Sequence, residues 1–446
     1  ALAREHAAAA WAPLASLLGP TLQVAGGRVR LSWHLAEVVK GRYLHSEPEH
    51  RDLWQGRLAA FFLTTGAASR RCEAPYHFVQ LDDAEGLLAS LTNWDAFRVL
   101  AQARRSDLAA YCRVAGGYEV AREALIQGID TSGPDGLERR LEVCAFLSHI
   151  GEFAAAKTSL EAARREASAA GGGFPLACAC ALLAENEVRF WDSRRNWESV
   201  GALQDLLESA QTAVEVLRTR SGRVREQGLY AQALTLRANG CFKAACVCPA
   251  EEADGYLAQA DEAVEEVQQL FAGCPPSRIL GRSILVGGVA KLVRAQNMRK
   301  AGEPYRQVMG RAGELFHKAQ VILVRTLGEI NESSVYTHSN LGELYMDIGQ
   351  INPALYHHLQ SCRVAVKLWG LEHPATNSKL QELAFFFHML RMPVAPQLLA
   401  SGRGEQSLQF IEDLLRQIPP VPNDRFIRAW VEAEGRSRGS SQSSAS

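Results

Sequence analysis

One segment of this chain repeats itself at a fixed interval, and this constrains the fold more than any other feature. Moving forward by 42 residues superposes Leu327-Gly328 on Trp369-Gly370, Leu341 on Leu383, Gly342 on Ala384 and Tyr345 on Phe387. The same alternation of large and small residues thus recurs in two successive units within 313–391. A unit of this length can hold a pair of helices, and such units stack on one another to bury a shared core.

Most of the chain has the periodicity of helices. From Asp52 onward apolar residues recur at helical spacing almost to the end, and after residue 31 no run alternates as a strand does. Breaks rich in Gly and Pro, such as 171–173 and 274–276, separate segments of roughly 12–25 residues. We therefore predict an all-α fold built from antiparallel helix pairs.

The clearest unit runs from Asn340 through Gly349 to Ala354. In it, Leu341 and Tyr345 are expected in the core, because they lie four residues apart and share one helix face. Gly342 and Ala354 are small enough to let two helices approach closely, and Gly349 permits the turn between them. The matching core residues one period later are Leu383, Ala384 and Phe387.

This pattern resembles the tetratricopeptide repeat, and its length of 42 residues is similar to the kinesin-light-chain type. The connector Gly370-Leu371-Glu372-His373-Pro374 matches the Leu-Gly-x-x-His-Pro connector of that family closely, whereas 328–332 matches only in its Gly. The resemblance implies a right-handed superhelix in which the first helix of each pair lines a concave groove. A further unit with the same offsets is expected at 137–168.

The resemblance also implies a partner-binding set, made of first-helix residues that the core does not use. These are Ser339, Asn340, Glu343 and, one period later, Gln381, Glu382 and Phe385. The family often uses such an asparagine to hold a peptide backbone, since one amide can both donate and accept. The competing interpretation is that these are ordinary solvated polar positions.

The N-terminal part predicts a compact element of different character. Residues 19–32 read as a short strand, a turn and a second strand between helices at 1–18 and 33–43. Together with 58–62 and 74–78, this segment resembles the winged-helix junction that follows the NACHT module in STAND-type ATPases of the nephrocystin kind. The resemblance implies a nucleotide-binding module upstream, and because Ala1 falls within an expected helix we expect the chain to be part of a longer protein.

Five regions follow from these patterns. We predict a winged-helix-like end of a preceding module at 1–50, a helical linker domain at 51–125, tetratricopeptide-like repeats at 126–400, C-terminal helices at 401–434 and a disordered tail at 435–446. The tail is rich in Ser, Gly and Arg and has too little apolar surface to offset its chain entropy.

No motif for catalysis, a cofactor or a metal is found. A phosphate-binding loop is absent, and Gly287-Gly288 lies in a helical run where small residues favour close packing. The pair His357-His358 is interpreted as solvated or interfacial, because adjacent residues face different sides of a helix. None of the ten cysteines forms a C-x-x-C pair, so we expect buried, reduced thiols rather than a zinc site. We therefore predict that the chain is not an enzyme.

Charge and hydropathy limit the classes of partner that we expect for this chain. The 48 basic and 49 acidic residues leave a net charge of -1, which favours neither nucleic acid nor an anionic membrane. The apolar run from Leu176 ends at Glu185, too short to span a bilayer. We expect a cytoplasmic scaffold that binds protein or peptide partners, including a cytoskeletal or ciliary assembly. The alternatives are a motor adaptor of the kinesin-light-chain type and an enzyme that uses the helical array as support.

Overall fold

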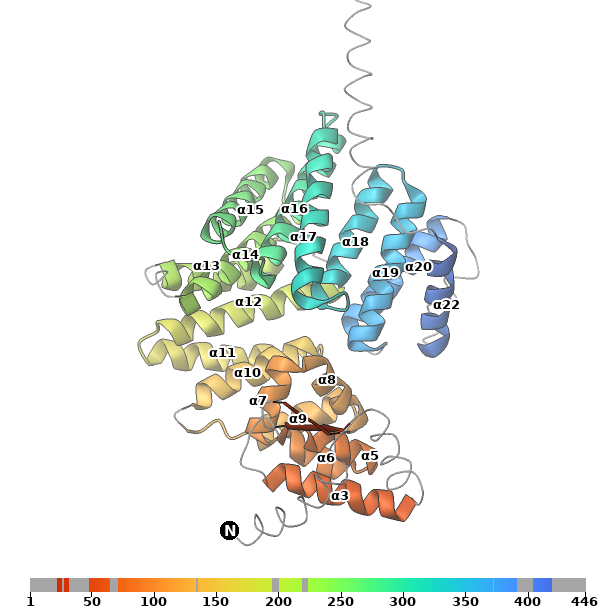
Figure 1. The fold of residues 1–446 in the computed structure, drawn as a ribbon. Helices are drawn as coiled ribbons and strands as arrows, with labels where there is room; N and C mark the ends of the chain where they lie inside the picture. The colour runs from red at the N-terminus through yellow and green to blue at the C-terminus, as the bar shows by residue number, and fades with distance from the viewer. Residues whose placement is uncertain are drawn as a thin grey trace, which may run out of the picture. The chain divides into compact units, whose positions relative to one another are not determined.

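The computed structural model describes residues 22–25, 28–31, 48–64, 71–133, 135–194, 200–218, 224–371, 373–390 and 404–418 (Figure 1). Within these ranges all regular secondary structure is helical except one two-stranded hairpin, which confirms the predicted all-α class. The chain divides into two compact units, Ala1–Ile129 and Asp130–Ser446. The division falls four residues after the predicted boundary between linker and repeats.

Unit 1 holds a hairpin and six helices in its described part. The strands pair antiparallel, with Leu22 opposite Leu31 and Ala25 opposite Arg28, so the two expected strands are present. The helices predicted at 1–18 and 33–43 lie outside the described residues, and the winged-helix interpretation stays a prediction. The elements are β1 (Leu22–Ala25), β2 (Arg28–Leu31), α3 (Pro48–Thr64), α5 (Ala74–Gln80), α6 (Ala84–Leu91), α7 (Trp94–Ala103), α8 (Arg105–Val114) and α9 (Tyr118–Gly128).

Side-chain caps begin two of the short helices in unit 1. The Asp83 carboxylate accepts from the backbone N–H of Gly86 at 2.8 Å, and the Asn93 amide oxygen accepts from that of Ala96 at 3.2 Å. Each bond satisfies one of the backbone donors that a helix leaves free at its first turn. Phe97, on α7, is fully buried.

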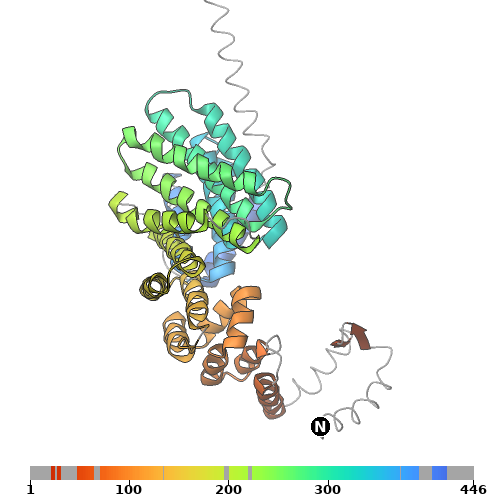
Figure 2. The same cartoon turned by 90° about the vertical axis from the view of Figure 1, so that its left-hand side faces the viewer.

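Unit 2 is a succession of helices in which each packs against the next along the chain (Figures 1 and 2). Hydrogen bonds from Ser361 to Val335 and from Thr376 to Ala365 show that consecutive helices run antiparallel here. The elements are α10 (Gly136–His149), α11 (Phe153–Ala169), α12 (Phe174–Arg194), η3 (Val200–Leu203), α13 (Gln204–Arg218), α14 (Val224–Val247), α15 (Ala250–Leu270), α16 (Arg278–Lys300), α17 (Arg306–Leu327), α18 (Glu332–Asp347), α19 (Ile351–Trp369), α20 (Pro374–Met389) and α22 (Gly404–Gln417).

The predicted repeat residues lie in the core of unit 2. Leu341, Tyr345, Ala354, Leu383 and Phe387 have no exposed surface, and Ala384 is half-buried. Gly342 lies so close to the ring of His358 that a Cβ added there would be 2.7 Å from Nε2. Gly349 has φ of 76°, a left-handed conformation that glycine adopts without strain.

The small residues in the Gly287-Gly288 run also serve packing. A Cβ on Gly288 would lie 2.6 Å from the ring of Phe316, and one on Gly287 would lie 3.0 Å from a methyl group of Val264. Helices α15 and α17 therefore approach α16 at these two glycines. This agrees with close helix contact rather than a phosphate loop.

The 42-residue period extends to the helix boundaries. Helix α17 ends directly before Gly328, whose φ is 80°, and α19 ends directly before Gly370, whose φ is 78°. Three residues later, the Asn331 side chain accepts from the N–H of Ser334, and His373 accepts from that of Ala375. The two connectors, which share only a glycine in sequence, thus place a helix cap at equivalent positions.

Candidate partner-binding surface

The predicted partner-binding residues divide into buried and exposed members. Ser339 and Glu382 are buried, and the Ser339 hydroxyl donates to the Glu382 carboxylate at 2.6 Å. The Lys379 ammonium donates to the same carboxylate at 2.5 Å and to Ser339 Oγ at 3.0 Å. These two residues depart from the expectation that they face a partner, because they bond to each other and join α18 to α20.

The other four members are accessible. Asn340 is half-buried, whereas Glu343 and Gln381 are exposed. Phe385 has 61% of its surface exposed, although its neighbours Phe386 and Phe387 are buried. Because consecutive helices are antiparallel, α18 and α20 run in the same direction, and Glu343 and Phe385 both lie about one turn beyond the Ser339–Glu382 bond. We refer to the surface formed by Asn340, Glu343, Gln381 and Phe385, which lies between the middle of α18 and α20 and their C-terminal turns, as the accessible end of this pair.

A buried ionic cluster lies between α12 and three other helices. Arg189 on α12 donates to both carboxylate oxygens of Glu332 on α18, at 2.9 and 3.0 Å, and to Glu185 at 3.0 Å. Glu185 also accepts from Arg282 on α16 at 3.1 Å and from Gln232 on α14 at 3.0 Å. These bonds join α12 to α14, α16 and α18, each of which is the first helix of a later pair.

Mutual neutralisation keeps this cluster charged. Burial alone would raise the pKa of Glu185, but Arg189 and Arg282 together lower it to about 2. Burial opposes ionisation of Glu332 too, and the same two guanidinium groups hold its pKa well below the usual range. Both carboxylates are therefore ionised at neutral pH, and each buried charge has an opposite charge in contact.

The C-terminal end of α12 makes further contacts with α14 and α20. The buried Lys243 ammonium pairs with the carboxylate of Asp192, and the Ser378 hydroxyl donates to the backbone oxygen of Asp192 at 3.5 Å. Lys379 lies over the ring of Tyr336 at 5.5 Å. Helix α12 therefore contacts α20 at Ser378, one turn before Glu382.

Local sequence pattern does not predict this ionic cluster. Its only local signal is the charged run that begins at Glu185, directly after an apolar stretch on the same helix. Arg189 and Glu332 are 143 residues apart, so no local spacing relates them.

The adjacent histidines belong to a buried cluster, which corrects their interpretation as a solvated or interfacial pair. His357 and His358 are 4% and 5% exposed. The Nδ1 atoms of His338 and His357 are 2.9 Å apart, and the ring of Tyr345 stacks on that of His357 with centroids 5.4 Å apart. Burial, with Arg363 and His317 nearby, lowers the pKa of His338 to about 4. Burial is the main cause that lowers the pKa of His357 well below its usual value, and the neighbouring histidines lower it further.

The cysteines are free thiols and most are enclosed. Cys112, Cys144 and Cys241 are buried, and desolvation raises the pKa of each thiol, to about 12, 11 and 11 respectively. Cys246 and Cys274 are exposed, contrary to the expectation of buried thiols. Among the residues that the structure describes, no three His, Cys, Asp or Glu side chains are grouped as metal ligands would be.

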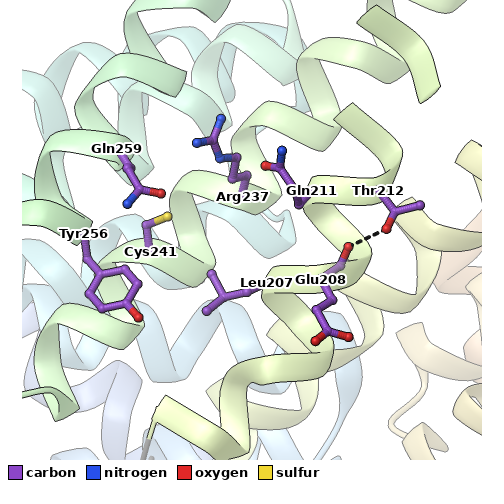
Figure 3. A pocket seen from close by; sticks show the side chains of 8 residues that line it. All are labelled: Leu207, Glu208, Gln211, Thr212, Arg237, Cys241, Tyr256 and Gln259. Carbon is purple, nitrogen blue, oxygen red and sulfur yellow. Dashed lines mark hydrogen bonds between the residues drawn. The ribbon is translucent and has the colours of Figure 1, made fainter. Parts of the chain in front are cut away.

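A pocket of about 620 Å³ lies in unit 2 among α13, α14 and α15 (Figure 3). Its lining was not singled out from the sequence. The lining residues are Leu207, Glu208, Gln211, Thr212, Arg237, Cys241, Tyr256 and Gln259.

No family model and no curated protein matches this chain. In the described part of the chain, no helix combines the length and the apolar character needed to cross a bilayer.

Proposed function

We propose that unit 2 is a protein-interaction scaffold that binds a segment of a protein partner at the accessible end of α18 and α20. The observation that carries this proposal is the exposure of Phe385, an aromatic side chain that leaves 61% of its surface in water. Large apolar side chains of this kind are typical anchors in protein interfaces. Met389, one turn further along α20, adds a second apolar side chain that is 44% exposed.

The polar residues beside Phe385 supply directional contacts. Asn340, Glu343 and Gln381 can together donate to and accept from a peptide backbone or bind a basic side chain. The buried Ser339–Glu382–Lys379 group supports this surface by fixing α18 against α20. A partner segment with an apolar side chain flanked by a basic residue suits these groups best.

At the level of the whole protein, we propose that this region is the C-terminal sensor of a STAND-type NTPase. The support is the resemblance of the N-terminal segment, together with the β1–β2 hairpin at the expected position. A cargo or motor adaptor of the kinesin-light-chain type, acting at the cytoskeleton or a cilium, is the second candidate, favoured by the Gly370 to Pro374 connector. A phosphate-binding loop upstream favours the first, and a coiled-coil heptad region favours the second.

Affinity capture with the Phe385→Ala variant tests the binding surface. Proteins recovered with the unaltered chain should be lost or strongly reduced, while the melting temperature stays close to that of the unaltered chain. Phe61→Ala is a matched control, because Phe61 is 53% exposed but lies in unit 1. Equal recovery with Phe385→Ala and Phe61→Ala would reject this surface.

A further inference from the structure

The pocket among α13, α14 and α15 contains a guanidinium group without a carboxylate partner. Within the described residues, Arg237 on α14 forms no ion pair or hydrogen bond, although it is half-buried. Lys243 on the same helix pairs with Asp192, and Lys291 and Arg294 both pair with Asp261. Arg237 lacks the anionic partner that each of these three residues has, and a cation that is partly withdrawn from water gains from such a partner.

Two further polar side chains of the lining have no bonding partner among the described residues. The hydroxyl of Tyr256 and the side-chain amide of Gln259 bond to none of the described residues, and both line the pocket. By contrast, the Tyr230 hydroxyl, elsewhere between α14 and α15, donates to Glu266 at 2.5 Å. Arg237, Tyr256 and Gln259 thus line the pocket without a bonding partner among the described residues.

The single carboxylate in the lining does not neutralise Arg237. Glu208 accepts a hydrogen bond from Gln204 Nε2 at 2.6 Å, and its backbone oxygen accepts from Thr212 at 2.8 Å. Its carboxylate points to the side of the pocket opposite the Arg237 guanidinium (Figure 3). The volume near Arg237 is thus open to an external anion.

We propose that this pocket binds a small organic carboxylate, whose charged group pairs with Arg237 and whose apolar part lies over Leu207 and the Tyr256 ring. A volume of about 620 Å³ is in the range of small-molecule sites. Charge-assisted bonds to a guanidinium are strong and directional, so Arg237 is the group that holds the carboxylate of the ligand. This site is independent of the surface at Phe385.

Saturation-transfer NMR titrations with phenylacetate test the proposal on the full chain. Phenylacetate should bind saturably, and the neutral isostere phenylacetamide should bind about tenfold more weakly or worse, because it cannot pair with a cation. This comparison uses the unaltered protein and so does not depend on any variant folding. Equal affinity for both compounds, or no saturable binding of phenylacetate, overturns the proposal.

Two arginine variants locate the site. Arg237→Gln should weaken phenylacetate binding by about tenfold or more, and Arg325→Gln, at an exposed arginine on α17, should leave it within about twofold. Equal effects of the two variants would show that binding occurs elsewhere. A peptide ending in a free carboxylate is the third probe, and selective binding of that peptide over phenylacetate would assign the pocket to a protein terminus and contradict a small-molecule site.

Discussion

The Nε2 atom of His373 donates a hydrogen bond of 3.0 Å to the backbone oxygen of His149, 224 residues earlier in the chain. The Nδ1 atom of the same ring accepts from the N–H of Ala375, which fixes the tautomer that places the proton on Nε2. The ring also stacks on Trp369, with centroids 4.9 Å apart. One connector residue therefore caps α20, packs on α19 and joins the last repeats to α10.

Replacing His373 by Ala should lower the free energy of unfolding by about 1–3 kcal/mol, because a helix cap and a buried hydrogen bond are lost together. Urea unfolding of the purified protein measures this change. His388→Ala is the matched control, since His388 lies on the same helix and is exposed. Equal midpoints for the two variants would show that the connector histidine has no stabilising role.

Arg189→Met should destabilise unit 2 more strongly, by about 3–5 kcal/mol, because Glu332 and Glu185 would lose their shared cation in a buried site. The exposed Arg325 provides the comparison: Arg325→Met should change the stability by less than about 0.5 kcal/mol. Thermal unfolding of both variants separates the two effects. A small change for Arg189→Met would mean that the buried cluster contributes little to holding α12 against α18.

Acidification from pH 7 to pH 5 should destabilise the protein through the buried histidines. The pKa of His338 is about 4 in the folded state and about 6.5 when unfolded, so the unfolded state binds more protons between these values. Stability is therefore complete above pH 6.5 and decreases as the pH falls, by about 2 kcal/mol at pH 5 for His338 alone. Glu185, with a folded pKa of about 2, adds a loss only below its unfolded value near 4.5.

Denaturant unfolding at a series of pH values checks this prediction with the His338→Gln variant. The groups that face His338 are His357, His317, Arg363 and Gln320, and none of them is a carboxylate that could stabilise a protonated ring. The variant should show a shallower decline between pH 7 and pH 5. An unchanged decline would assign the acid sensitivity to other groups.

Leu341→Ala should cost about 2–5 kcal/mol, since its side chain is fully buried in a cluster with Phe316 and Tyr345. Leu327→Ala is the natural comparison, because Leu327 lies at the end of α17 and is 38% exposed. Chemical denaturation should show a much smaller change for Leu327. Similar losses for both would remove Leu341 from its assigned place in the repeat core.

Local sequence pattern predicts the helices and the repeat core because both depend on spacing within a single unit. Leu341 and Tyr345 share a helix face whatever surrounds them, and a buried face is the only stable place for that pair. The same rules predict a helix cap at Asn331, because Asn is a favoured capping residue and Asn331 precedes His373 by one period of 42 residues. Residues 328–332 share only their glycine with the connector from Gly370 to Pro374, and this difference hides the equivalence of Asn331 and His373.

Local spacing does not predict which residues of the partner-binding set are buried and which are exposed. Ser339 and Glu382 occupy positions where a repeat usually faces outward, yet both are buried and α12 contacts α20 one turn before Glu382. Those contacts join residues more than 140 positions apart, and periodicity within one unit holds no information on them. Local spacing also does not predict the pocket at Arg237, because its lining comes from three helices with no shared motif.

The central claim is that the accessible end of α18 and α20 binds a protein partner. The most direct test is affinity capture or proximity labelling with the Asn340→Ala/Glu343→Ala double variant beside the unaltered chain, with the melting temperature of each recorded. We expect the double variant to melt within a few degrees of the unaltered chain and to lose its specific partners, because both side chains reach solvent and neither lies in the core. Unchanged partner recovery with an unchanged melting temperature would contradict the claim.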